Sequence, residues 1–368
     1  MTRPVVVVED DPFLRMIGVA LDPSTPSERV SAFADFFSCD LPDFDGWLQK
    51  VRAEAGSLYP AEVRLVGTEA EYRQALPTAH ALVIESLPAG VNEVASAPRL
   101  RAIHKYGTIT RGIDRAVCAA RGIPVLTLRR RANIACAEHA IMLMLALARK
   151  LVRVAGRVSV DQLRAAGYAP RLYDRRHTAN SNWARVGELR LLHGSTLGIV
   201  GLGEIGRELA TRASAFGMRV VYYQRKPLPA TESAEWQAEY RSFDSLLAES
   251  DWVSVNVPGN ASTRHMFDRA AFERMKPGAC LINVARADVV EREALVDALR
   301  TRRLGGFALD PLYEAPGRSD DPLLAFDNVI VTPHLAAQPR FNALDDLNDL
   351  IRRLGGALSC WEARLQSC

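Results

Sequence analysis

The stretch "STLGIVGLGEIGRELATRASAFG", residues 195–217, decides how most of this chain folds. An apolar run leads directly into Gly201, Gly203 and Gly206, and a segment with helical spacing follows. In this strand–turn–helix context, Gly201 permits a tight turn, Gly203 lets the backbone approach a pyrophosphate, and Gly206 lets helix and strand pack closely. The free N–H groups of the helix would hold phosphates. We therefore predict dinucleotide binding here, the alternative being a glycine turn without a ligand.

Apolar strands alternate with helical segments on both sides of this turn, which is the pattern of parallel sheets covered on both faces. The strands predicted before the turn are "PVVVVED", "ALVIESLPAG", "LRAIHKYGTIT" and "IPVLTL". Those predicted at and after it are "TLGIVG", "RVVYY", "WVSVNVP", "ACLINVA", "LGGFALD" and "VIVTPH". The fold class expected is α/β, with two doubly wound Rossmann-like domains, parallel sheets and a cleft between the domains.

The domain limits follow from these two series of strands, and 368 residues are too many for one ordinary core. We expect a substrate-binding (catalytic) domain of residues 1–132 plus 335–368, and a dinucleotide-binding Rossmann domain of residues 133–334. A long helix should run from about Asn133 to Arg153. Residues 25–60 read as helices broken by proline and glycine, and the C-terminal helix should fold back on the first domain.

Composition narrows the class of protein. With 46 basic and 43 acidic residues the charge is nearly balanced, so we expect no nucleic-acid partner. The six cysteines form no CxxC pair and the histidines show no metal-ligand spacing, which favours a cytoplasmic protein without a metal site. The first residues enter acids at once, unlike a secretory signal. The apolar stretch "IACAEHAIMLMLALARKLV" is interrupted by charges, and we read it as a buried helix rather than a membrane span.

The end of the strand "RVVYY" bears on the choice of cofactor. An acid at this place would bind both ribose hydroxyls of NAD and repel a 2′-phosphate. The sequence has Gln224 there, followed by Arg225 and Lys226, which can pair with a phosphate. This favours NADP over NAD, the alternative being that both cations are solvated loop charges.

Three other strand ends carry candidate reactive side chains. Arg286 follows an apolar strand, where its guanidinium could fork onto a substrate carboxylate. His334 follows Pro333 at another strand end, and histidine is suited to giving and taking a proton near neutral pH. Asp310 ends a third strand, with Glu314 shortly beyond it. In a parallel sheet such ends gather at one edge, so these side chains should converge.

At this point the chain resembles the D-isomer-specific 2-hydroxyacid dehydrogenase family. The resemblance rests on "LGIVGLGEIGRELATRASAFGMRVVYY", "MKPGACLINVARADVVEREALVDAL", "GGFALDPLYEAP" and "DNVIVTPHLAA". It is looser in "LRAIHKYGTITRGIDRAVCAARGIPV" and "NIACAEHAIMLMLALAR", and covers roughly residues 80–340. Such proteins exchange a hydride between NAD(P)H and a 2-oxo or 2-hydroxy acid with D specificity, so the resemblance implies an oxidoreductase.

The resemblance also implies a triad of arginine, glutamate and histidine. Arg286 corresponds to the arginine that binds the substrate carboxylate, and His334 to the acid/base. The family's glutamate stands directly before a proline; here that position is Ala315, ahead of Pro316, and Glu314 lies one residue early. Either a shift of the loop brings Glu314 to the histidine, or Glu314 faces solvent. A carboxylate beside a histidine favours the imidazolium. Without it, reduction of an oxo acid should fall off at lower pH.

Two further sets of residues follow from the resemblance. The residues expected to contact the cofactor are Gly201, Gly203, Glu204, Ile205, Gly206, Gln224, Arg225, Lys226, Val257, Pro258, Ala285 and Asp310. Those expected to bind the substrate are Ser86, Leu87, Gly107, Thr108 and Arg286. Asp310 should lie near the nicotinamide amide, with capping of the strand end as the alternative role. Glu85 is an unusual neighbour for an anionic substrate.

The function expected is therefore that of an NAD(P)-dependent 2-hydroxyacid dehydrogenase working on a small-molecule acid, as a homodimer and without a membrane or nucleic-acid partner. Two alternatives stay open. One is a dehydrogenase for an unusual acid, such as a phosphonate or a sugar acid, with a site rebuilt around Ala315. The other is a cofactor-sensing protein that kept the fold and lost turnover, against which the presence of both Arg286 and His334 argues.

Overall fold

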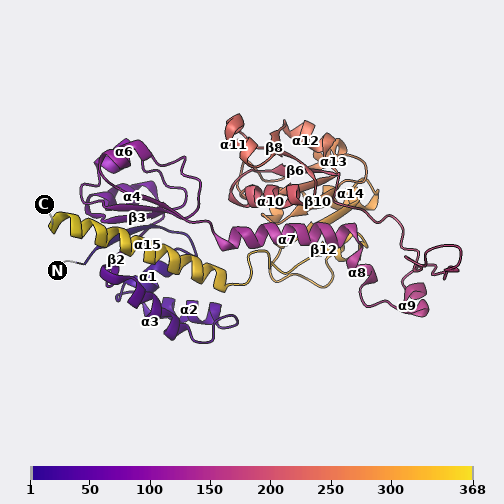
Figure 1. The fold of residues 1–368 in the computed structure, drawn as a ribbon, viewed down its shortest axis with the longest axis horizontal. Coiled ribbons are helices and arrows are strands. Elements are labelled where there is room, and N and C mark those ends of the chain that lie inside the picture. Colours follow the sequence, from indigo (N-terminus) through magenta and orange to yellow (C-terminus); the bar gives the residue numbers. More distant parts are fainter. Residues whose placement is uncertain (1–2, 367–368) are drawn as a thin grey trace. The chain divides into compact units, whose positions relative to one another are not determined.

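The computed structural model describes residues 3–366, with side chains up to Cys360, and divides into two compact units. Unit 1 is Met1–Asn133 with Gln338–Cys368, and unit 2 is Ile134–Ala337. Each contains one parallel sheet, which confirms the α/β fold class with two Rossmann-like sheets. Figure 1 shows the elements of both units coloured along the chain.

Unit 1 contains a five-stranded sheet in the order β2-β1-β3-β4-β5. Its strands are β1 (Val5–Glu9), β2 (Glu62–Val66), β3 (Ala81–Ile84), β4 (Ala102–Lys105) and β5 (Val125–Thr127). Its helices are α1 (Met16–Leu21), α2 (Ser27–Phe37), α3 (Phe44–Glu54), α4 (Glu69–Ala75), α5 (Val91–Ala95), α6 (Arg115–Ala120) and α15 (Phe341–Gln366), with short 3-10 turns η1 (Gly56–Leu58) and η2 (Leu76–Thr78).

The two faces of this sheet are covered by different helices because alternate strand residues point to opposite sides. Val6 and Val8 of β1 pack with α1, α3 and α15, whereas Val5 and Val7 pack with the helices α4 and α6. The C-terminal helix α15, drawn in yellow, buries six of its residues in the first of these cores. Residues 25–60 form the predicted broken helices, α2 and α3.

Unit 2 contains a seven-stranded sheet in the order β12-β11-β10-β9-β6-β7-β8. Its strands are β6 (Thr196–Val200), β7 (Arg219–Tyr223), β8 (Ala238–Tyr240), β9 (Trp252–Val255), β10 (Cys280–Asn283), β11 (Gly306–Leu309) and β12 (Val329–Val331). Its helices are α7 (Arg131–Ala148), α8 (Leu151–Val154), α9 (Val160–Ala165), α10 (Glu204–Ala215), α11 (Ala230–Glu235), α12 (Phe243–Glu249), α13 (Arg269–Arg274) and α14 (Arg292–Arg300), with 3-10 turns η3 (Ala287–Val289) and η4 (Pro322–Ala325).

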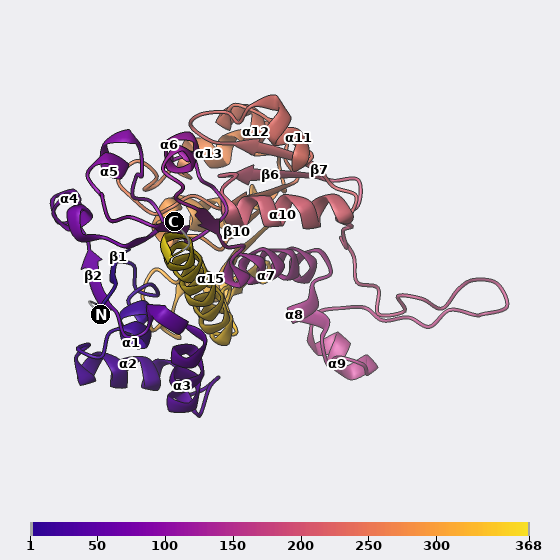
Figure 2. The same cartoon turned by 60° about the vertical axis from the view of Figure 1, so that its left-hand side comes forward.

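Helices α7 and α10 cover one face of this sheet, and α12, α13 and α14 cover the other. Figure 2 shows α7 and α10 running side by side. The strand order reverses between β6 and β9, and open α/β sheets bind ligands at the carboxyl ends of their strands at such a point. The glycine turn after β6 lies there.

The predicted long helix from Asn133 to Arg153 is interrupted in the structure. Helix α7 ends at Ala148, Lys150 has a left-handed φ of 51°, and α8 begins at Leu151. By length and composition α7 could cross a membrane, but half of it is buried and its Ala137, Ala140 and Leu143 belong to the core of unit 2. It therefore packs as a core helix does.

Candidate active site

The glycine turn of unit 2 has the geometry that its three glycines imply. Gly201 has a φ of 102°, and a Cβ there would lie 2.7 Å from the carbonyl oxygen of Asn256, so the position requires glycine. A Cβ at Gly206 would lie 2.2 Å from the Gly201 carbonyl oxygen, which shows how closely α10 approaches the turn. At Gly203 nothing lies within 4 Å of a Cβ position, so the backbone is open to an incoming group.

A dinucleotide fits these features. Helix α10 begins at Glu204, followed by Ile205, directly after Gly203, so the positive end of its dipole lies at the glycine turn and favours a phosphate there. Val257 and Pro258 follow the neighbouring strand β9, across the point where the strand order reverses. The structure thus brings these predicted cofactor residues to one edge of one sheet.

The segment after β7 carries the residues predicted to select the cofactor. Gln224 comes directly after the strand, and its side-chain amide donates a hydrogen bond to the Lys226 carbonyl oxygen at 2.6 Å. This bond holds the turn and uses one of the two N–H groups of the Gln224 amide. Arg225 and Lys226 are exposed, and neither side chain has an ion-pair partner among the described residues.

The strand β10 places Arg286 at the same edge of the sheet. The fully buried Asn283 fixes the segment: its amide donates to the Arg286 carbonyl oxygen at 2.8 Å, and its oxygen accepts from the Ala285 N–H at 3.0 Å. The Arg286 guanidinium is exposed and donates to the Ala285 carbonyl oxygen at 2.7 Å. Gly259 makes room for it, because a Cβ there would lie 2.8 Å from the Arg286 Cγ. Most donors of this guanidinium thus face outward, available to a carboxylate.

His334 follows the end of β12, two residues beyond Thr332. In the sheet, β11 lies between β12 and the strand β10 that precedes Arg286. His334 has a left-handed φ of 58°, and its backbone N–H donates to the carbonyl oxygens of Asp310 at 3.0 Å and Thr332 at 2.9 Å. The imidazole is exposed and makes no hydrogen bond within residues 3–360. A non-glycine residue in this region of φ costs free energy and persists only where the surroundings hold it.

Asp310 supplies that support. Its carboxylate is fully buried and accepts hydrogen bonds from the Thr332 hydroxyl at 2.6 Å and from the N–H groups of Leu335 and Ala336 at 2.7 and 2.8 Å. Burial favours the protonated form, but His139, Thr332 and these N–H groups outweigh it and lower the pKa of Asp310 to about 2. The Asp310 carboxylate therefore caps this strand end and holds both sides of His334, and its contact with the nicotinamide amide stays a prediction.

His139 of α7 completes this network. Its Nε2 lies 3.1 Å from the Thr332 hydroxyl and 3.4 Å from the Asp310 carboxylate. Sequence reasoning gave His139 no role because its partners lie far along the chain. The only sequence signal for it is a histidine within an otherwise apolar core helix.

Glu314 does not reach His334 by any described hydrogen bond. It is exposed and lines a cavity of about 410 Å³ together with Tyr313, Thr332 and Pro333. Ala315, at the place of the family's glutamate, is exposed as well. His334 therefore stands without a carboxylate partner in the described part of the chain.

In unit 1 the predicted substrate residues lie in loops after β3 and β4. The Glu9 carboxylate, at the end of β1, accepts from the N–H groups of Glu85, Ser86 and Leu87 at 2.6, 2.7 and 3.1 Å, and from the Ser86 hydroxyl. Burial raises the pKa of Glu9, but the Ser86 hydroxyl and the three N–H groups together hold that pKa below its ordinary value. Glu9 was not foreseen from the sequence.

Glu85, the unusual neighbour for an anion, has a cationic partner in this loop. Arg130 donates to its carboxylate at 2.7 Å and stacks over the Tyr106 ring at 4.0 Å from the centroid. Burial raises the pKa of Glu85, and Arg130 opposes that rise. Gly107, with a φ of 146°, and the exposed Thr108 come directly after Tyr106 in the turn that follows β4.

The fold and the site of unit 2 define a dinucleotide-binding α/β protein. The family model for "D-isomer specific 2-hydroxyacid dehydrogenase, NAD binding domain" matches residues 141–336, more than half of the chain. A glyoxylate reductase from Pyrococcus furiosus is 35% identical over 258 residues, covering 70% of this chain and 72% of that protein. The chain therefore belongs to the D-isomer specific 2-hydroxyacid dehydrogenase family.

Two other comparisons support narrower conclusions. A D-3-phosphoglycerate dehydrogenase from Archaeoglobus fulgidus is 33% identical over 282 residues, which is 76% of this chain but only 49% of that protein. The crystal structure of a D-mandelate dehydrogenase from Rhodotorula graminis aligns with a TM-score of 0.56 at 23% identity, covering 96% of this chain and 93% of that one. At this identity the likeness shows the fold alone.

Proposed function

We propose that this protein reduces a 2-oxo acid to the D-2-hydroxy acid with a nicotinamide cofactor, and catalyses the reverse reaction. The observation that carries the proposal is the placement of Arg286 and His334 after β10 and β12, at the sheet edge that also holds the glycine turn. Membership of the family and the similarity to a glyoxylate reductase support it.

The division of labour follows from the side chains. The cofactor supplies the hydride, and the protein supplies orientation and charge. Arg286 binds the substrate carboxylate through two N–H groups and draws charge from the neighbouring carbonyl. As the hydride reaches the carbonyl carbon, protonated His334 donates a proton to the carbonyl oxygen, and the hydroxy acid forms. In the oxidation direction neutral His334 accepts that proton.

We propose that the absence of the family's glutamate, at the place of Ala315, lowers the rate of the reaction without abolishing it. No described carboxylate orients the His334 ring, and this task falls to the backbone held by Asp310. We propose that reduction falls off at a lower pH than it would with a carboxylate partner, because such a partner favours the imidazolium. The Ala315→Glu variant should extend the reduction rate to higher pH in a pH–rate profile. An unchanged profile would contradict this.

We further propose that NADP is preferred over NAD. The exposed cations Arg225 and Lys226 follow β7, without ion-pair partners among the described residues, and the Gln224 side chain carries no charge to repel a 2′-phosphate. A phosphate between two cations at a protein surface gains charge-assisted hydrogen bonds.

The test is the oxidation of NADPH and of NADH with glyoxylate, hydroxypyruvate and pyruvate, followed spectrophotometrically. In the Arg225→Ala/Lys226→Ala variant we expect the KM for NADPH to rise about tenfold or more, with the KM for NADH nearly unchanged. The exposed Arg300 serves as the control, since Arg300→Ala should alter neither value. A wild-type protein that uses NADH alone would contradict the preference.

We also propose a cytoplasmic homodimer. The segment after α7 exposes several large apolar side chains, which in a soluble protein mark an interface. These are Leu151, Val152, Val158, Leu172 and Leu191. Light scattering after size exclusion should give twice the chain mass of 40.5 kDa, and Leu172→Glu with Leu191→Glu should yield the monomer.

A further inference from the structure

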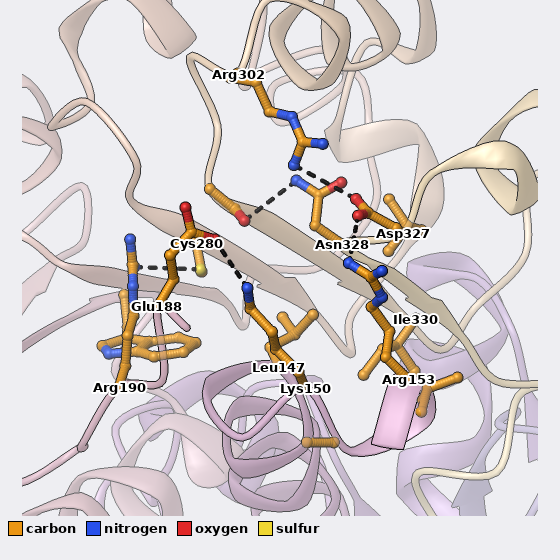
Figure 3. A pocket seen from close by; sticks show the side chains of 15 residues that line it. Leu147, Lys150, Arg153, Glu188, Arg190, Cys280, Arg302, Asp327, Asn328 and Ile330 are labelled. Atoms are coloured by element: carbon orange, nitrogen blue, oxygen red, sulfur yellow. Dashed lines mark hydrogen bonds and ion pairs between the residues drawn. The ribbon is translucent and has the colours of Figure 1, made fainter. Parts of the chain in front are cut away.

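A cavity of about 500 Å³ opens in unit 2 at the edge of the sheet opposite the candidate active site (Figure 3). Trp252, Cys280 and Val329, the first residues of β9, β10 and β12, line it. The other ends of β10 and β12 lead to Arg286 and His334. Because parallel strands run the same way, the cavity and the reacting side chains are separated by the length of the strands. Neither the proposed reaction nor the cofactor site uses it.

Cations outnumber carboxylates in the wall of this cavity. Four basic side chains line it, Lys150, Arg153, Arg190 and Arg302, against two acidic ones, Glu188 and Asp327.

The acids are already engaged. Lys150 pairs with Glu188 at 2.8 Å, whereas Asp327 takes both Arg153 at 2.7 Å and Arg302 at 3.4 Å. Figure 3 shows these pairs on opposite sides of the cavity. An excess of two positive charges remains, which favours an anion of matching charge.

Among the described residues Arg190 forms no direct ion pair, and the carboxylates of Glu188 and Asp251 act on it only at longer range. Its Nη1 lies 3.7 Å from the Cys280 Sγ, and no described carboxylate lies within ion-pair distance of it. Burial raises the pKa of the Cys280 thiol to about 11, and Arg190 opposes this only in part, so the sulfur is uncharged near neutral pH. The Arg190 backbone N–H donates to the Ala148 carbonyl oxygen at 2.9 Å, which fixes the residue at the cavity. The Arg190 guanidinium is exposed at the cavity and can bind a carboxylate or a phosphate through two N–H groups.

The remaining wall is apolar, formed by Ala146, Leu147 and Ile330 among others. A volume of this size lies within the range of small-molecule sites, which is roughly 300–1,000 Å³. We infer that this cavity binds a small organic or inorganic dianion, with one anionic group on Arg190 and the second near Arg153 and Arg302, which share the single carboxylate of Asp327. The site is distinct from that of the substrate, and the inference does not depend on the proposed reaction.

Isothermal titration with two probes tests the inference and identifies the anionic group. The probes are succinate, a dicarboxylate, and pyrophosphate, and NADPH is present in excess so that the glycine turn is occupied. We expect at least one probe to bind, and Arg190→Gln to weaken that binding about tenfold or more. Binding of succinate alone indicates a dicarboxylate ligand, and binding of pyrophosphate alone a phosphorylated one. Binding should weaken as salt is added.

Controls separate this site from the active site. Arg300→Gln, an exposed arginine outside the cavity, should bind the probe as the wild type does. Arg302→Gln, whose side chain is 70% exposed, should weaken binding severalfold and serves if Arg190→Gln does not fold. Turnover of Arg190→Gln without probe should equal that of the wild type. Failure of both probes to bind, or binding unchanged in the cavity variant that folds, overturns the inference whether or not the protein reduces oxo acids.

Discussion

Glu9 in unit 1 and Asp310 in unit 2 have the same structural role in different surroundings. Glu9 is the last residue of β1, and Asp310 comes directly after β11. Each carboxylate accepts hydrogen bonds from backbone N–H groups in the loop after a neighbouring strand, and each of these loops carries predicted site residues. Glu9 is half-buried and holds residues 85–87. Asp310 is fully buried and holds Leu335 and Ala336, on the far side of His334.

The difference lies in how strongly each loop is fixed. Asp310 has two side-chain partners besides the backbone, Thr332 and His139, and its pKa falls to about 2. Glu9 has one, Ser86, and its pKa is lowered without reaching such an extreme. The comparison indicates that the segment of His334, the predicted acid/base, is tied to a fully buried carboxylate, whereas residues 85–87 are tied to a half-buried one. Rigid placement matters most where a proton must be transferred.

Among the variants that probe the two carboxylates and their partners, the largest effect is expected for Asp310→Asn. An amide can accept from fewer of the N–H and O–H donors, so the His334 segment should shift and kcat should fall about 100-fold. The lowered pKa corresponds to roughly 2 kcal/mol of stability at neutral pH. That contribution is present above the unfolded-state pKa and disappears as the pH falls toward about 2. Urea unfolding of both proteins should show a gap at pH 7 that narrows in acid. A constant gap would contradict this origin.

Glu9→Gln should have a smaller effect, on KM rather than on kcat. The variant loses the charge that holds the three N–H groups of residues 85–87, and we expect the KM for the oxo acid to rise about tenfold. Glu62→Gln, on the exposed edge strand β2, is the matched control and should leave KM unchanged. Steady-state kinetics at saturating cofactor provide the measurement. A fall in kcat with constant KM would reverse the comparison between the two loops.

Arg130 tests whether the charge of Glu85 must be neutralised. Arg130→Gln leaves the Glu85 carboxylate without its cation, so the KM for an anionic substrate should rise about fivefold through repulsion. Adding Glu85→Gln should restore most of the loss, since both charges are then absent. The KM of both variants for the oxo acid is measured by steady-state kinetics. A KM of the double variant as high as that of the single variant would show that Arg130 acts by contacting the substrate rather than by neutralising Glu85.

An effect as small as that of Arg130 is expected for His139, here on kcat. His139→Leu removes one hydrogen bond to the Thr332 and Asp310 pair, so kcat should fall about fivefold. His139→Gln keeps a donor at this place and should recover most of the rate. Recovery would assign His139 a positioning role through Asp310. Equal losses in both variants would show that its packing matters and its hydrogen bond does not.

Much of the fold could be predicted because the decisive signals are local. The glycine turn and the apolar strands of unit 2 are read from neighbouring residues. The missed strands are edge strands: β2 carries charges at Glu62 and Arg64, and β8 has only three residues. The break of the predicted long helix at Lys150 has no glycine or proline to mark it.

The supporting residues of the site could not be predicted because their partners are distant in sequence. Glu9 meets Ser86 at a separation of 77 residues, and His139 meets Thr332 at 193. The motif residues Arg286 and His334 are visible at strand ends, but what fixes them is not: Asn283 and Asp310 act through buried hydrogen bonds that only the fold creates.

The most direct test of the account compares wild-type protein with His334→Gln in NADPH-dependent reduction of glyoxylate and of bulkier 2-oxo acids. Equilibrium binding of NADPH to both proteins is measured alongside. We predict turnover by the wild type, a loss of kcat of about 100-fold or more in the variant, and cofactor binding that is nearly equal in both. Cofactor binding without turnover of any oxo acid by the wild type, or full activity of the variant, would contradict the central claim.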